Sequence, residues 1–109
     1  MNILEEKLSE LLRNGKDWEK KATSMPGIYV MRLPAYKNLP ARLSVELKPI
    51  DAEGKPTTKR GVLIKTINEL NNFKSILNDE KLANLISNIQ SVNPKIVRKE
   101  NEEEDIIEI

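Results

Sequence analysis

The sequence contains no cysteine and no histidine. Disulfide bonds, thiolate catalysis, zinc sites with the usual ligands and histidine general bases are therefore excluded. Every apolar run is much shorter than the roughly 18 residues that a membrane-spanning helix needs. The N-terminus also lacks the apolar stretch of a secretory signal. We therefore expect a soluble, cytoplasmic protein that uses no metal and no cofactor and has no membrane partner.

Aromatic residues are scarce, with only Trp18, Tyr29, Tyr36 and Phe73 in the chain. Sequence motifs of catalysis are missing too, because there is no phosphate-binding glycine loop, no paired-carboxylate motif and no nucleophile elbow. Acid–base candidates near a turn are limited to Asp51 and Glu53, and turn chemistry explains Asp51. The sequence thus predicts no catalytic residues and a protein that is not an enzyme.

The formal net charge of +1 hides a strong asymmetry along the chain. All 18 Lys and Arg residues precede position 100, whereas six of the 17 Asp and Glu residues lie at 100–109, so residues 1–99 carry +7 and the remainder −6. A basic body with an acidic tail suggests an anionic partner. A solvated surface with a disordered end would give the same pattern.

Residues 42–66 predict a long β-hairpin. Apolar Leu43, Val45 and Leu47 alternate with polar residues, which predicts a strand with these three buried and its other face in water. That wet face would hold Arg42, Ser44, Glu46 and Lys48. Residues 51–54 suit a type I turn closed by glycine, and the run 62–65 returns as the second strand. The β-branched and aromatic run 28–33 predicts another strand.

Helices are expected both before and after these strands in the chain. Residues 2–14 form an amphipathic pattern that either packs on the domain or pairs with another copy. Thr66 and Glu69 match a capping box, and apolar residues spaced three and four apart form a buried stripe to about residue 92, as two helices or one kinked helix. Residues 95–99 suggest an edge strand.

These elements predict the α+β fold class. We expect a small antiparallel sheet of three to four strands within 26–66, an N-terminal helix in 1–14, and helices from 66–92 packed on one face. Residues 1–99 would form a single domain, and residues 100–109 a disordered acidic tail, because dense charge prevents the burial that folding needs.

The order of strand, basic arm, strand and capped helix over about residues 41–92 resembles the positive-cofactor-four type of single-stranded DNA-binding fold. The run LPARLSVELKPIDAEGKPTTKRG is similar to the ThermoDBP group of archaeal single-stranded DNA-binding proteins, with a likeness extending upstream to about Pro26. This resemblance implies a homo-dimer or higher oligomer and single-stranded DNA in a basic, partly apolar cleft. The resemblance implies that five cations of this chain contact the DNA, namely Arg42, Lys55, Lys59, Arg60 and Lys65. The long C-terminal heptad run of zipper-bearing ThermoDBP proteins is missing, which leaves the mode of dimerisation open.

We therefore predict a single-stranded DNA-binding protein with little sequence specificity, with RNA as the alternative nucleic acid. Cations would track the phosphates and aromatic side chains would stack on bases. The predicted nucleic-acid-binding residues are Trp18, Tyr29, Tyr36, Lys37, Arg42, Lys48, Lys55, Lys59, Arg60 and Lys65. Both Trp18 and Tyr36 also fit a simpler role, covering the edge of the hydrophobic core.

The tail ends in Asp-Ile-Ile-Glu-Ile, a pattern typical of short recognition peptides. It resembles in character the tails of bacterial single-strand binding proteins, which recruit partners. Replication or repair proteins would then dock on Ile106, Ile107 and Ile109, or the tail would regulate the domain itself. The alternative function is a protein-interaction or transcription-regulating module without tight nucleic-acid binding of its own.

Overall fold

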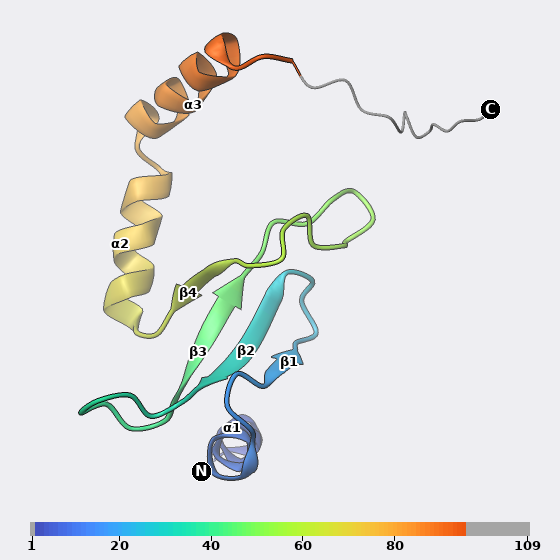
Figure 1. Cartoon of the computed structure of the whole chain (residues 1–109), viewed down its shortest axis with the longest axis vertical. Coiled ribbons are helices and arrows are strands. Elements are labelled where there is room, and N and C mark those ends of the chain that lie inside the picture. Colours follow the sequence, from blue (N-terminus) through green and yellow to red (C-terminus); the bar gives the residue numbers. More distant parts are fainter. Residues whose placement is uncertain (1, 96–109) are drawn as a thin grey trace, which may run out of the picture. The chain divides into compact units, whose positions relative to one another are not determined.

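A computed structural model describes residues 2–95 and contains a four-stranded antiparallel sheet (Figure 1). The strands follow their sequence order, β1-β2-β3-β4. Their bounds are Lys20–Ala22 for β1, Ile28–Leu33 for β2, Arg42–Leu47 for β3 and Val62–Ile64 for β4. The predicted α+β fold class is confirmed, including the N-terminal helix and the pairing of β3 with β4 as a hairpin. β1 was not predicted as a strand.

The register divides the sheet into two faces. One face, which we call the front face, carries Lys20, Tyr29, Met31, Ser44, Glu46 and Leu63. The opposite, back face carries Lys21, Val30, Val45, Leu47 and Ile64.

The prediction of which side of β3 is buried was wrong. Ser44 and Glu46, expected in water, are each only 3% exposed, whereas Leu43, Val45 and Leu47 are half-buried. The reason is that the neighbouring strands and the returning end of the β3–β4 connection supply polar partners on the front face. The Ser44 hydroxyl, for example, donates to the Ile64 carbonyl at 3.2 Å.

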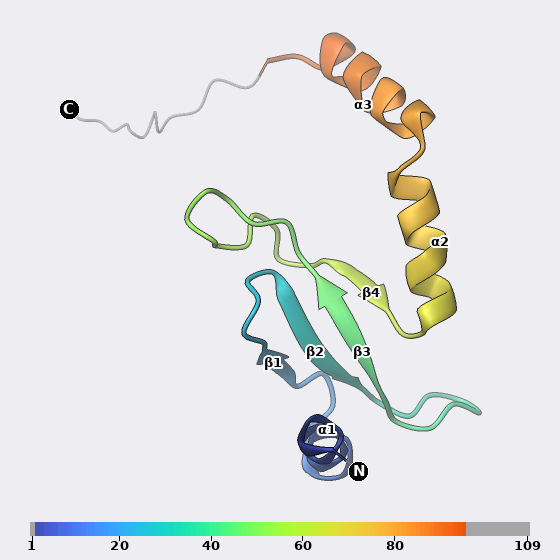
Figure 2. The ribbon, with the colours of Figure 1, turned by 180° about the vertical axis from the view of Figure 1, so that it is seen from behind.

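The helix α1, Ile3–Asn14, lies behind the sheet at the end opposite the long β3–β4 connection (Figure 2). Asn2 and Glu5 form a reciprocal capping box, since each side chain accepts a hydrogen bond from the other's backbone N–H. Leu11 is the buried residue of this helix. The Arg32 guanidinium donates to the Leu12 carbonyl at 2.8 Å, which ties the helix to β2.

The β3–β4 connection, residues 48–61, forms a basic arm whose tip is the predicted turn. Gly54 has φ +83° and donates to the Asp51 carbonyl at 2.9 Å, as expected of a glycine closing this turn. Where the arm returns, Gly61 lies so close to β3 that an added Cβ would stand 1.9 Å from the Leu47 carbonyl oxygen. Glycine is therefore required for the arm to approach β3.

The helices α2, Ile67–Leu77, and α3, Glu80–Val92, form where the sequence predicts them, as two separate helices. The Thr66 hydroxyl accepts the Glu69 N–H at 3.1 Å, and Asp79 caps α3 by accepting from Lys81 at 2.9 Å. The chain divides into two compact units, with the boundary between residues 72 and 73. No residue of α2 or α3 is buried, which differs from the expected buried stripe.

Three predictions concern residues outside the described part of the chain. These are the edge strand at 95–99, the tail at 100–109, and the partner-binding isoleucines Ile106, Ile107 and Ile109.

Candidate nucleic-acid interface

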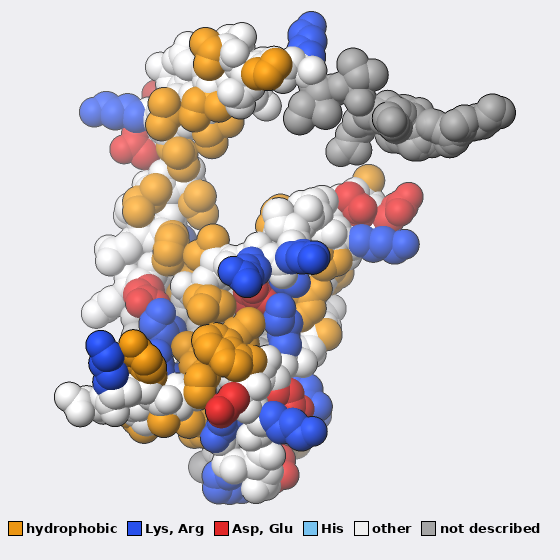
Figure 3. Space-filling model, viewed as in Figure 1, with side chains coloured by type: hydrophobic (Ala, Val, Ile, Leu, Met, Phe, Trp, Pro, Cys, Tyr) orange, Lys and Arg blue, Asp and Glu red, His pale blue; other side chains and the backbone are white. Residues whose placement is uncertain are grey.

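An open hollow of about 620 Å³ lies on the front face, where lysine and arginine side chains surround apolar ones (Figure 3). It is lined by Trp18, Lys20, Met31, Glu46, Lys59, Arg60, Gly61 and Leu63. Three segments far apart in sequence therefore build it: the connection into β1, the middle of the sheet, and the returning end of the basic arm. Cations with apolar side chains between them are what a nucleic-acid strand needs from a protein surface.

The floor of the hollow contains a buried carboxylate. Glu46 Oε1 lies 2.6 Å from Lys20 Nζ, and Glu46 Oε2 accepts the Gly61 N–H at 2.9 Å. Burial alone would raise the pKa of Glu46, but the hydrogen bonds from Lys20 and Gly61 outweigh it and hold the pKa below its ordinary value. The same hydrogen bond to Glu46 raises the pKa of Lys20. Both groups are therefore charged at neutral pH, and Glu46 joins β1, β3 and the arm.

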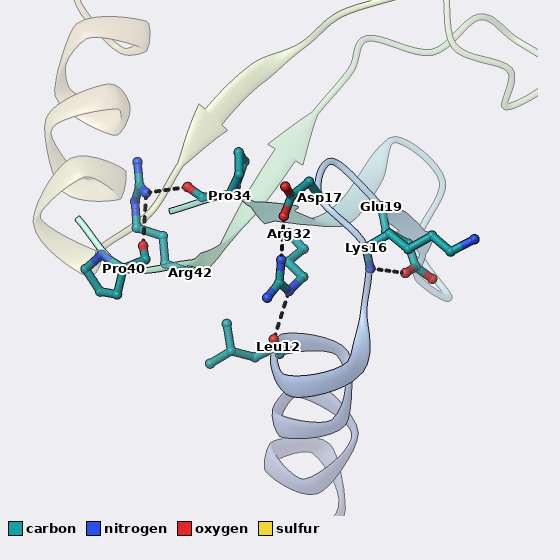
Figure 4. A network of polar contacts seen from close by, with 8 residues as sticks. All are labelled: Leu12, Lys16, Asp17, Glu19, Arg32, Pro34, Pro40 and Arg42. Atoms are coloured by element: carbon teal, nitrogen blue, oxygen red, sulfur yellow. Dashed lines mark hydrogen bonds and ion pairs between the residues drawn. The ribbon is translucent and has the colours of Figure 1, made fainter. Parts of the chain in front are cut away.

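Trp18 lies at the rim, 61% exposed, in a strained backbone conformation with φ +67°. Such a conformation costs about 1–3 kcal/mol for a bulky residue and persists only where the surroundings impose it. Here the Trp18 N–H donates to the Arg32 carbonyl at 2.7 Å. The Arg32 side chain in turn holds Asp17 at 2.8 Å as well as Leu12 (Figure 4). The fold therefore fixes the turn that carries an exposed indole.

A second cationic group borders the hollow around Tyr29. The ammonium groups of Lys20 and Lys48 lie 5.6 Å and 5.2 Å from the centre of the Tyr29 ring. Burial and the neighbouring charge of Lys20 lower the pKa of Lys48. Five of the ten predicted residues are thus found in or next to the hollow: Trp18, Tyr29, Lys48, Lys59 and Arg60.

The other five predicted residues lie elsewhere or are engaged locally. Arg42 donates to the Pro40 carbonyl at 3.3 Å, and Lys65 pairs with Glu69 at 3.7 Å. Tyr36 and Lys37 form their own cation–π pair at 5.3 Å on the β2–β3 loop, at the end of the strands away from the arm. Lys55 lies at the tip of the arm, next to the Asp51 turn.

The predicted site residues do not include Lys20, Glu46 or Arg32, which the structure places in or next to this site. Lys20 belongs to a three-residue strand whose Lys-Lys-Ala sequence has little β-propensity. The available signal was the Pro26-Gly27 break between residues 20–22 and β2, which marks a hairpin connection. For Glu46 no local signal exists, because its partners come from distant segments.

Within residues 2–95 there is no group of three acidic side chains placed to hold a metal ion. Over the same residues, every helix is too short or too polar to cross a membrane. Comparison with protein-family models, curated proteins and solved structures finds no match for this chain.

Proposed function

We propose that this protein binds single-stranded DNA with little sequence specificity through the front-face hollow. The observation that carries the proposal is the convergence of Lys20, Lys59 and Arg60 on a surface that also presents an exposed, conformationally fixed Trp18. Cations attract the phosphates without reading sequence, and an indole can stack on any base. RNA offers the same phosphates and bases and is the competing ligand.

The test is a titration of oligo-dT at about 50 and 200 mM salt, with RNA and duplex DNA as competitors. Affinity should fall steeply with salt, and Trp18 emission should be quenched on binding. Reversing Lys59 and Arg60 to Glu should weaken binding by roughly tenfold or more at low salt, since two phosphate contacts are replaced by repulsion.

The matched control reverses Lys7 and Arg13, an exposed lysine–arginine pair on α1 at the back of the sheet. This control should bind oligo-dT as the unmodified protein does. Equal binding by the Lys59/Arg60 variant and the control would refute the proposed site. Failure of the unmodified protein to bind oligo-dT at low salt would refute the function.

We further propose that the protein is a homo-oligomer held by α2 and α3. Seven large apolar side chains in these helices are between 42% and 80% exposed: Ile67, Ile76, Leu77, Leu85, Ile86, Ile89 and Val92. Residues 73–92 carry two lysines and two acidic residues, so their formal charge is zero and does not oppose self-pairing. Homodimer interfaces are also more apolar than transient ones.

Light scattering should give a mass above 12.5 kDa that returns to the monomer mass in a Leu85→Asp/Ile89→Asp variant. Ser87→Asp, which adds a charge at another exposed position of α3, is the control. A monomeric unmodified protein at micromolar concentration would contradict the oligomer.

A further inference from the structure

Two lysines from different strands converge on one aromatic ring next to the hollow. Lys20 comes from β1, Tyr29 from β2 and Lys48 from the residue that follows β3. Both ammonium groups lie within 6 Å of the Tyr29 ring centre, the range of a cation–π interaction. Since Tyr29 and Glu46 are register partners on the front face, the buried carboxylate belongs to the same group.

The charges in this group do not balance. Glu46 forms an ion pair with Lys20 at 2.6 Å, and within residues 2–95 no acidic side chain forms an ion pair with Lys48. Two ammonium groups therefore lie near the Tyr29 ring, and only that of Lys20 has a carboxylate as an ion-pair partner. Burial and the charge of Lys20 lower the pKa of Lys48, so its charged form is disfavoured. A bound anion would stabilise that charged form.

We propose that Lys20 and Lys48 bind one phosphodiester group of the single strand, and that Tyr29 is a positioning residue that places both lysines. A phosphodiester carries one negative charge and two free oxygens, so it can accept a hydrogen bond from each ammonium. Tyr29 then does not stack on a base, because its ring already interacts with the two ammonium groups. Trp18 at the rim provides the stacking surface instead. This inference rests on the proposed function and specifies how the strand is held.

The two roles for Tyr29 give different salt dependence. If Tyr29 positions the lysines, Tyr29→Leu and Lys48→Gln should each lower the slope of log affinity against log salt by roughly 0.7 to 1. The double variant should then lose little more than either single variant, because both changes remove the same phosphate contact. If Tyr29 stacks on a base, Tyr29→Leu should weaken binding equally at all salt concentrations. The losses of binding free energy in Tyr29→Leu and Lys48→Gln should then add up fully in the double variant.

The experiment measures oligo-dT binding by fluorescence anisotropy over a salt series for these variants. Lys7→Gln, which removes one positive charge from α1, is the control and should leave the slope unchanged. Quenching of Trp18 should persist in every variant. A slope that is unchanged in Lys48→Gln, or full additivity of Tyr29→Leu and Lys48→Gln, overturns the proposal.

A measurement without nucleic acid separates this proposal from the proposed function. Titration of the unmodified protein with inorganic phosphate, followed by NMR of the lysine side chains, should raise the pKa of Lys48, while the signals of the Lys7 side chain should not respond to phosphate. If oligo-dT does not bind but phosphate raises the pKa of Lys48, the function is wrong and the anion site stands. If phosphate leaves Lys48 unchanged, the anion site is refuted, whatever the affinity for oligo-dT.

Discussion

Replacing Glu46 with glutamine should destabilise the fold strongly for so small a change. Glu46 is 3% exposed; its Oε1 forms an ion pair with Lys20 Nζ at 2.6 Å, and its Oε2 accepts the Gly61 N–H at 2.9 Å. An amide has a single acceptor oxygen, so Glu46→Gln can keep one of these bonds and turns an N–H₂ donor toward the other donor. A hydrogen bond to a charged group contributes about 1.5–3 kcal/mol, so we expect a loss of ~2 kcal/mol. That corresponds to roughly 8 °C in melting temperature for a chain of this size.

The same substitution has a defined pH dependence. Because the folded state lowers the pKa of Glu46, its charge stabilises the protein fully above the pKa of the unfolded state. This contribution is lost as the pH falls through the lower pKa of the folded state. The stability deficit of Glu46→Gln should therefore be largest at about pH 7 and shrink below about pH 4.

Urea unfolding followed by circular dichroism, repeated between about pH 3.5 and 7, measures both effects. The control is Glu53→Gln, which removes a carboxylate from the exposed arm near its tip. A Glu46→Gln protein as stable as this control at neutral pH would refute the reasoning. So would a deficit that does not change with pH.

Further predictions concern Gly61, Arg32 and the acidic tail. Gly61→Ala should lower the melting temperature and weaken oligo-dT binding, because its Cβ would stand 1.9 Å from the Leu47 carbonyl oxygen and push the arm from Glu46. Arg32→Leu should increase acrylamide quenching of Trp18, because the turn loses the ion pair between Asp17 and Arg32; unchanged quenching would contradict this. A chain ending at Lys99 should bind oligo-dT more tightly at low salt but not at high salt, since six acidic residues no longer compete; equal affinities would exclude competition.

Local patterns in the sequence were sufficient to predict most of the elements. The alternation along β3 and β4, with Asp51 and Gly54 at the turn, predicted the hairpin, and Thr66 with Glu69 predicted the start of α2. Each of these signals comes from residues close together in the chain. Their physical causes, side-chain alternation, turn hydrogen bonds and helix capping, act over the same short range.

The buried side of β3 and the composition of the hollow depended on distant contacts. Alternation separates the two faces of a strand but does not say which face another segment will cover. Ser44 and Glu46 are buried on the front face, where their partners Ile64, Lys20 and Gly61 come from other segments of the chain. The cations of the arm were predicted from their charge, whereas the place of Lys20 in the hollow depends on its contact with Glu46 from a distant segment.

The strand order also has a consequence for the folding pathway. Each strand pairs with its neighbour in sequence, so the sheet is a meander built from local contacts, which favours rapid folding. The Lys20–Glu46 ion pair, by contrast, reaches across β2 from β1 to β3, and the Glu46–Gly61 hydrogen bond closes the arm. Closing these longer loops costs entropy that is recovered only when the strands are already aligned. We therefore expect the hollow to form after the transition state, so that Glu46→Gln accelerates unfolding in stopped-flow experiments and leaves the folding rate nearly unchanged.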